Sequence, residues 1–190
     1  MSIRILSFLM AFAFFSCSGS FDKTEYVKWV ENEQNGLRIK RSSPSVEYVL
    51  QYEPSFYKAL RFSPSGNKKD LTEAKEQFGD MHHFMLKNKP KKTFFTESAA
   101  ELSSFMAYDL RKNIRFAEGK DTLDRTVMYH LESSGGVSPY QRILLAFPKA
   151  QKLKSLNISI KPNKMDSIKQ EFNFDARTLK KLQSVTERIK

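Results

Sequence analysis

Apolar and polar residues alternate along several short stretches of the chain, a period of two that is typical of strands with one buried face. From Val46 to Tyr52, for example, every second residue is valine, tyrosine or leucine. Serines around Pro44 precede this stretch and predict a hairpin with the segment before it. We predict strands at 37–41, 46–52, 81–86, 93–95, 114–117, 123–131, 141–147, 153–160 and 168–174.

Helices are predicted where a capping residue precedes apolar positions spaced three or four apart. Asp22 and Glu25 have the spacing of a capping box, and so do Ser98 and Glu101. Basic residues from Lys87 to Lys92 interrupt the pattern and are interpreted as a loop. The predicted helices are 22–34, a short turn opened by Pro54, a segment capped by Asp70, the segment 97–112, and a last helix capped by Asp175.

These elements predict an α+β fold in which the strands after residue 113 form most of an antiparallel sheet or roll. The helix at 97–112 should pack across one face of that sheet, and the first helix and hairpin should complete or flank it. The part of the chain from residue 22 onwards is about 170 residues long, the size of a single domain. We therefore expect one α+β domain spanning 22–190.

The first seventeen residues have a different pattern. Arg4 is followed by an apolar run, 5–15, which is shorter than the roughly 20 residues that a membrane-spanning helix needs. The run ends at small residues around Cys17, the only cysteine of the chain. This pattern is typical of an export signal.

The segment Phe14-Phe15-Ser16-Cys17 resembles the lipobox of bacterial lipoproteins, and the phenylalanine-rich run is similar to those of small uncharacterised lipoproteins of the Bacteroidota. Ser16 and Cys17 fit the pattern, whereas Phe15 is larger than the usual residue. The resemblance implies a signal peptide at 1–16, a palmitate-bearing lipidated Cys17 with a tether at 17–21, and attachment to the outer membrane of the cell envelope. An ordinary secretory signal cut after Ser18 or Ser20 is the alternative.

The chain is strongly basic, with 32 lysines and arginines against 21 acidic residues and a net charge of +11. Such a charge would ordinarily indicate nucleic acid, but export excludes that partner and leaves an envelope protein, an acidic glycan or lipid head groups. A plain solvated surface is the other interpretation. The candidate patch for an anionic partner consists of Lys87, Lys89, Lys91, Lys92, Lys180 and Lys181.

No spacing in the sequence indicates a catalytic site, a cofactor or a metal. His82 and His83 are neighbours on a predicted strand, so they should point to opposite faces and cannot share an ion. The serines before Gly135 are explained by a turn between strands rather than by a nucleophile elbow. Glu118 and Asp121 are assigned to a solvated loop around Gly119.

The sequence therefore predicts a non-enzymatic, membrane-anchored lipoprotein that binds or assembles with an envelope partner through a basic surface. Two alternatives remain. One is an envelope hydrolase acting on glycan or lipid, which requires a pocket where ionisable groups with shifted pKa values converge. The other is an immunity-type lipoprotein that neutralises a toxin.

Overall fold

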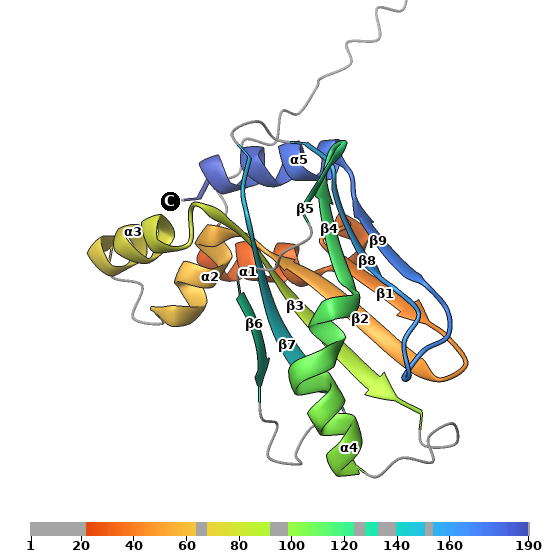
Figure 1. The fold of residues 1–190 in the computed structure, drawn as a ribbon. Helices are drawn as coiled ribbons and strands as arrows, with labels where there is room; N and C mark the ends of the chain where they lie inside the picture. The colour runs from red at the N-terminus through yellow and green to blue at the C-terminus, as the bar shows by residue number, and fades with distance from the viewer. Residues whose placement is uncertain are drawn as a thin grey trace, which may run out of the picture.

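The computed structural model describes residues 22–63, 68–91, 99–123, 128–132, 140–150 and 154–189. It has an α+β fold with two antiparallel sheets, as predicted for the fold class (Figure 1). The larger sheet has the strand order β1-β2-β3-β7-β6, and the smaller has the order β5-β4-β8-β9. In the described part of the chain, no helix is both long and apolar enough to cross a membrane.

The larger sheet joins the N-terminal hairpin to strands from the middle of the chain. The smaller sheet is made from the segments that follow residue 113. The strands of the larger sheet are β1 (Arg38–Ser42), β2 (Val46–Glu53), β3 (Met81–Pro90), β6 (Met128–Glu132) and β7 (Gln141–Pro148). Those of the smaller sheet are β4 (Ile114–Glu118), β5 (Asp121–Leu123), β8 (Leu156–Ile160) and β9 (Gln170–Phe174).

Two of the predicted helix starts are confirmed in detail. Asp22 and Glu25 form a capping box at the start of α1, and Asp175 accepts a hydrogen bond from the backbone of Thr178 at the start of α5. The helices are α1 (Lys23–Glu31), α2 (Ser55–Phe62), α3 (Lys68–Gln77), α4 (Ala99–Ser104) and α5 (Ala176–Glu187). The α4 helix continues through a π turn, Phe105–Asp109, and a 3-10 turn, Leu110–Asn113, and a 3-10 turn at Glu33–Asn35 follows α1.

The hydrophobic core lies between the two sheets and is rich in aromatic rings. Phe84 on β3 contacts both Phe116 on β4 and Phe174 on β9, with ring centroids 6.1 and 5.6 Å apart. Phe116 also stacks on Phe147 of β7. Aromatic pairs of this kind add to the free energy gained from apolar burial, and they hold the two sheets face to face.

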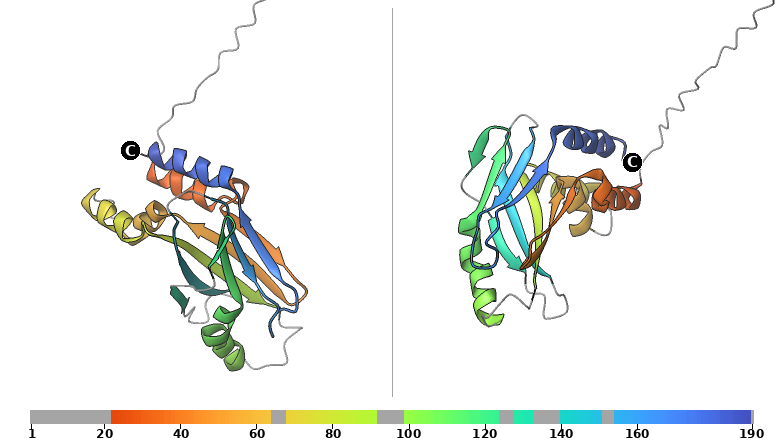
Figure 2. Two further views of the ribbon diagram at one scale, coloured as in Figure 1. Left: turned by 45° about the horizontal axis from the view of Figure 1, so that its top comes forward. Right: turned by 90° about the vertical axis from the view of Figure 1, so that its right-hand side faces the viewer.

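Helices cover the ends and the open edges of this core. Figure 2 shows α1 and α5 side by side at one end, where Thr186 donates a hydrogen bond to the Tyr26 hydroxyl. The helical segment that starts with α4 packs on the inner face at β6, where the Tyr129 hydroxyl donates to the carbonyl of Met106. The predicted packing of this helical segment on a sheet face is therefore confirmed for residues 99–113.

The prediction of one main sheet from residues 113–174 is wrong, because those strands divide between two sheets. Strand β3 pairs with β2 on one side and β7 on the other, which makes the N-terminal hairpin part of the larger sheet. Strand β4 pairs with β5 and β8 instead. Each sheet then buries one apolar face against the other. In the predicted arrangement, one helix would have had to cover the apolar face of a single sheet.

Three local predictions need correction or fall outside the described residues. The segment from Lys87 to Pro90 is not a loop, because it extends β3 and pairs with both neighbouring strands. Asp70 is not an N-cap, since α3 already includes Lys68. The predicted strand at 93–95, Ser98 as a cap, and the turn at 133–136 lie outside the described residues.

Candidate functional site

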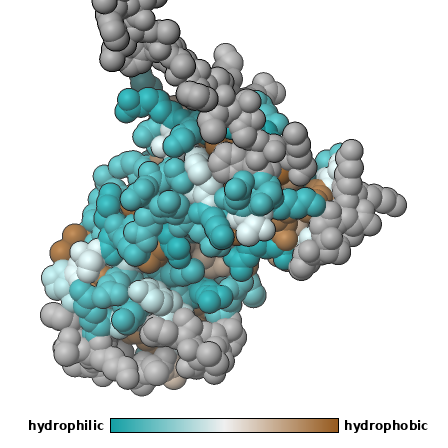
Figure 3. All heavy atoms as spheres, turned by 180° about the vertical axis from the view of Figure 1, so that it is seen from behind, coloured by the Kyte–Doolittle hydropathy of each residue, from teal (hydrophilic) through white to brown (hydrophobic). Residues whose placement is uncertain are grey.

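The face of the larger sheet that points away from the core carries charged residues on several strands. Because directly paired residues share a face, the register brings Lys40, Lys87 and Arg142 into one row and Arg38, Gln51 and Met85 into the next. The view from behind looks onto this side of the molecule and is mostly hydrophilic (Figure 3). We call it the outer face.

Two adjoining cavities follow the outer face beneath helices α1 and α2. The first has a volume of about 340 Å³ and the second about 250 Å³. Glu53, Arg61 and Met85 line both cavities, which together we call the outer groove. The first cavity is also lined by Val27, Glu31, Arg38, Gln51, Tyr57, Lys87 and Arg142, and the second by Lys58, Phe62, Glu132 and Leu144.

Four cationic side chains line the first cavity of the outer groove, namely Arg38, Arg61, Lys87 and Arg142. Partial burial, together with the charges of Arg38, Arg142 and Arg61, lowers the pKa of Lys87. Within the described residues, neither Lys87 nor Arg142 forms a hydrogen bond or an ion pair through its side chain. The cavity therefore has more cationic than acidic side chains in its lining, since only Glu31 and Glu53 stand against the four cations.

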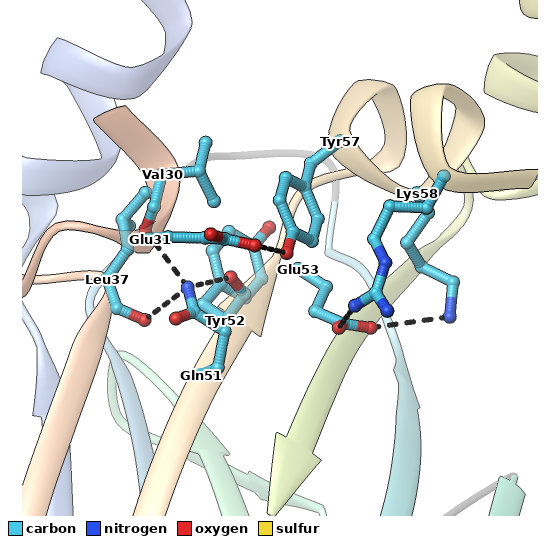
Figure 4. A network of polar contacts seen from close by, with 9 residues as sticks. Val30, Glu31, Leu37, Gln51, Tyr52, Glu53, Tyr57 and Lys58 are labelled. Carbon is cyan, nitrogen blue, oxygen red and sulfur yellow. Dashed lines mark hydrogen bonds and ion pairs between the residues drawn. The ribbon is translucent and has the colours of Figure 1, made fainter. Parts of the chain in front are cut away.

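Acidic and polar groups line the same cavity, and Figure 4 shows four of them, Glu31, Gln51, Glu53 and Tyr57. The Tyr57 hydroxyl donates a 2.6 Å hydrogen bond to Glu31. The Gln51 amide nitrogen donates to three backbone carbonyls, those of Val30, Leu37 and Tyr52, at 2.9–3.1 Å. Three acceptors around one atom identify it as the nitrogen, so the Gln51 carbonyl oxygen points away from them.

A buried cluster of one carboxylate and two cations lies where the two cavities adjoin. Glu53 lies 3.6 Å from both Lys58 and Arg61, and its side chain is only 5% exposed. Burial raises the pKa of Glu53, and the two cations oppose that rise. The Lys58 ammonium also lies over the rings of Phe62 and Phe78. These contacts fix Glu53, Lys58 and Arg61 as a rigid part of the groove.

The lysines predicted as an anionic-partner patch do not form one surface. Lys87 and Lys89 share the outer face on β3, whereas the Lys91 side chain donates to Ser42 and to the carbonyl of Ser43. Lys92 lies outside the described residues. Lys180 and Lys181 are on α5, at the other end of the molecule from the end of β3 (Figure 1).

Sequence reasoning missed Arg38, Arg61 and Arg142 as companions of Lys87. The available signal was partial alternation, because Arg142 lies in the opposite phase of β7 from Ile143, Leu145 and Phe147, and Arg38 lies in the opposite phase of β1 from Ile39. Only the strand register brings them together with Lys87, and Arg61 reaches the same cavity from a helix. The lysine-rich run, which was interpreted as a loop, therefore identified Lys87 but none of the three arginines of the cationic cluster.

A second polar cluster lies inside the core. The Tyr52 hydroxyl is 3.2 Å from His82 Nδ1, and His82 Nε2 is 3.4 Å from a Glu118 oxygen without a well-aligned hydrogen bond. The other Glu118 oxygen accepts a 2.8 Å hydrogen bond from the backbone of Ala150. Burial lowers the pKa of His82, which the Glu118 carboxylate opposes. Tyr52 and Ala150 line a cavity of about 430 Å³ beside α5.

The assignment of Glu118 to a solvated loop is therefore wrong, since its side chain is 2% exposed. It follows Ile114 and Phe116 in the inward phase of β4, and only Gly119, at φ 64°, begins the turn. The prediction that His82 and His83 point to opposite faces is confirmed by the register, because His82 pairs with Phe147 and His83 with Ala146. No cluster of three metal-ligating side chains occurs within the described ranges.

Comparisons with known proteins add little to this geometry. No protein-family profile and no curated protein matches the chain. Among solved structures, a protein of unknown function from Burkholderia pseudomallei is similar to it, with 7% sequence identity and a TM-score of 0.37. The alignment covers 88% of this chain and 91% of that one. A similarity of this level carries no argument about function.

Proposed function

We propose that the chain is an exported lipoprotein, held on the outer membrane of the cell envelope by lipidated Cys17, whose folded part binds an acidic partner in the outer groove. The observation that best supports the binding role is the pairing of Lys87 with Arg142. These two cations face each other across β3 and β7, and neither side chain forms a hydrogen bond or an ion pair with a described residue. An acidic group bound between them would relieve the repulsion.

The remainder of the groove supports the same role. Arg38 and Arg61 add positive charge from β1 and α2, and Arg61 is held by Glu53. Guanidinium groups suit carboxylate and phosphate partners because their planar fork can donate two parallel hydrogen bonds. The groove is a preformed concave site of the size typical of ligand pockets.

The test uses the mature chain in detergent and polygalacturonate as an acidic polymer, at low and at physiological salt. We expect the double variant Lys87→Gln/Arg142→Gln to bind at least tenfold more weakly than the wild type at both salt concentrations. The double variant Lys180→Gln/Lys181→Gln removes the same charge from α5 and should bind like the wild type. Equal losses in both variants would mean that net charge alone drives binding, and would overturn the groove as the site.

A second candidate function, an envelope hydrolase acting on glycan or lipid, is favoured by the cluster of Tyr52, His82 and Glu118. These groups converge beside the cavity at α5, and burial raises the pKa of Tyr52 and lowers that of His82. The matched test is turnover of chromogenic esters and glycosides by the wild type and by Tyr52→Phe. Turnover that the variant loses would support the hydrolase, and no turnover above the blank would exclude it for these substrates.

A further inference from the structure

The outer groove has cationic, hydrogen-bond-accepting and aromatic side chains, and a small anion would contact only the cations. We propose that its ligand is an acidic oligosaccharide, with a hexuronate (a sugar residue that carries a carboxylate) in the first cavity and a neighbouring sugar ring on Phe62 in the second. This inference rests on the proposed function, and it names the chemical class of the acidic partner.

The carboxylate end of such a ligand has a defined place. Lys87 and Arg142 are directly paired in the β3–β7 register, so both side chains rise from the floor at the same level. Arg142 is exposed and Lys87 is half-buried, which leaves both accessible from the groove. A single carboxylate between them would accept charge-assisted hydrogen bonds from both.

Hydrogen-bond acceptors beside these cations select against a simple anion. Glu31 and Glu53 line the same cavity, and their carboxylates would repel a multiply charged phosphate or sulfate. Gln51 lines the cavity as well, but its carbonyl oxygen is buried and out of reach of a ligand. Sugar hydroxyl groups are donors that suit the carboxylates lining the cavity, and the one carboxylate of a hexuronate suits the cations.

An exposed aromatic ring marks the far end of the groove. Phe62 lines the second cavity, and 68% of its surface is exposed, so its ring is accessible to a ligand. Phe78 lies 5.3 Å from it between ring centroids, and the Lys58 ammonium lies 5.6 Å from its ring, so the ring is held in place. The apolar C–H face of a sugar ring packs well on a fixed, exposed aromatic ring.

The apolar residues between the two ends complete the fit. Met85 lines both cavities, and Leu144, which is paired with it on β7, lines the second. These side chains give a sugar ring an apolar surface between its polar edges. Because Met85 and Arg61 belong to both cavities, one ligand of two linked sugars can extend through the groove from Lys87 to Phe62.

The experiment is calorimetric titration of the mature chain in detergent with digalacturonate, glucuronate, acetate, inorganic phosphate and the neutral disaccharide maltose. We expect digalacturonate to bind at least tenfold more tightly than acetate, phosphate or maltose, and glucuronate to fall between. Phe62→Ala should weaken digalacturonate binding about fivefold and leave acetate binding unchanged. Tyr108→Ala removes another ring, 70% exposed, from the helical segment after α4 and should change nothing.

The outcomes separate this inference from the proposed function. If acetate or phosphate binds as tightly as digalacturonate, and Lys87→Gln/Arg142→Gln abolishes that binding, the groove binds acidic groups but the oligosaccharide is wrong. If Phe62→Ala leaves digalacturonate binding unchanged, the placement of the second sugar is wrong. If no acidic ligand binds the wild type, the proposed function fails as well.

Discussion

Lys87 on β3 and Arg142 on β7 lie directly opposite one another on the outer face of the larger sheet. Like charges in this position destabilise a pair of antiparallel strands. Glu132 is paired with Arg142 on the other side, yet the two side chains form no ion pair among the described residues. This arrangement is unfavourable for folding alone, and in the function that we propose an acidic group in the groove relieves the repulsion.

The first prediction concerns the stability of the protein without ligand. Lys87→Gln should raise the free energy of unfolding by about 0.5 kcal/mol, because it removes the repulsion from Arg142 and Arg38. Added salt should shrink the difference, since it screens the repulsion in the wild type. Urea unfolding at two salt concentrations measures both effects, and a less stable variant at low salt would contradict the repulsion.

The second prediction concerns the buried pair Glu53 and Lys58. Lys58→Met leaves Glu53 buried with Arg61 as its remaining cation, so we expect a loss of about 3 kcal/mol. The double variant Glu53→Gln/Lys58→Met removes the uncompensated charge and should recover most of that loss. The same urea experiment on both variants tests this, and equal stability of the two variants would show that Glu53 is not the source of the loss.

The third prediction concerns pH. Burial and the nearby Lys58 lower the pKa of His83 to about 4, against about 6.5 for an unfolded chain. Between pH 6.5 and 4 the unfolded state therefore binds more protons, so the free energy of unfolding should fall as the pH is lowered through this range. Below about pH 4 this contribution stays constant.

His83→Gln removes this contribution, while His82, whose pKa is also lowered, still titrates in the same direction. The variant should lose less stability than the wild type between pH 7 and pH 4.5, measured by urea unfolding at each pH. Parallel pH profiles for the two proteins would exclude His83 as a source of acid sensitivity.

The fourth prediction concerns the anchor. Cys17 is the only cysteine of the chain, so Cys17→Ala removes the only site for a thioether-linked lipid. The variant should lose labelled palmitate and leave the membrane fraction, whereas Ser18→Ala should retain both. A Cys17→Ala protein that stays in the membrane fraction would show that the protein is held there in another way.

Local signals predicted much of the fold. A capping box at Asp22 and an N-cap at Asp175 placed two helix starts, and alternation from Val46 to Tyr52 placed a strand. The pairing of β3 with β2 and β7 is a long-range property of the chain, and alternation alone does not encode it. The two-sheet architecture therefore could not be predicted from the patterns of single segments.

The candidate site was less predictable than the fold for the same reason. Lys87 was identified from a basic run, but Arg142 and Arg61 reach it only through strand pairing and a helix placed over the sheet. Glu118 shows a different limit, because its acidic neighbours suggested solvent, whereas β4 extends one residue beyond the predicted strand and places Glu118 in its inward phase after Ile114 and Phe116.

The most direct test of the outer groove is an NMR titration that follows the methionine methyl groups of the mature chain as digalacturonate is added. Met85 lies on the floor of the groove, whereas Met106 and Met165 are buried in the core between the sheets. We predict a saturable shift of the Met85 signal with Met106 and Met165 unchanged, and no Met85 shift in Lys87→Gln/Arg142→Gln. A Met85 signal that stays fixed while the ligand binds would contradict the outer groove as the binding site.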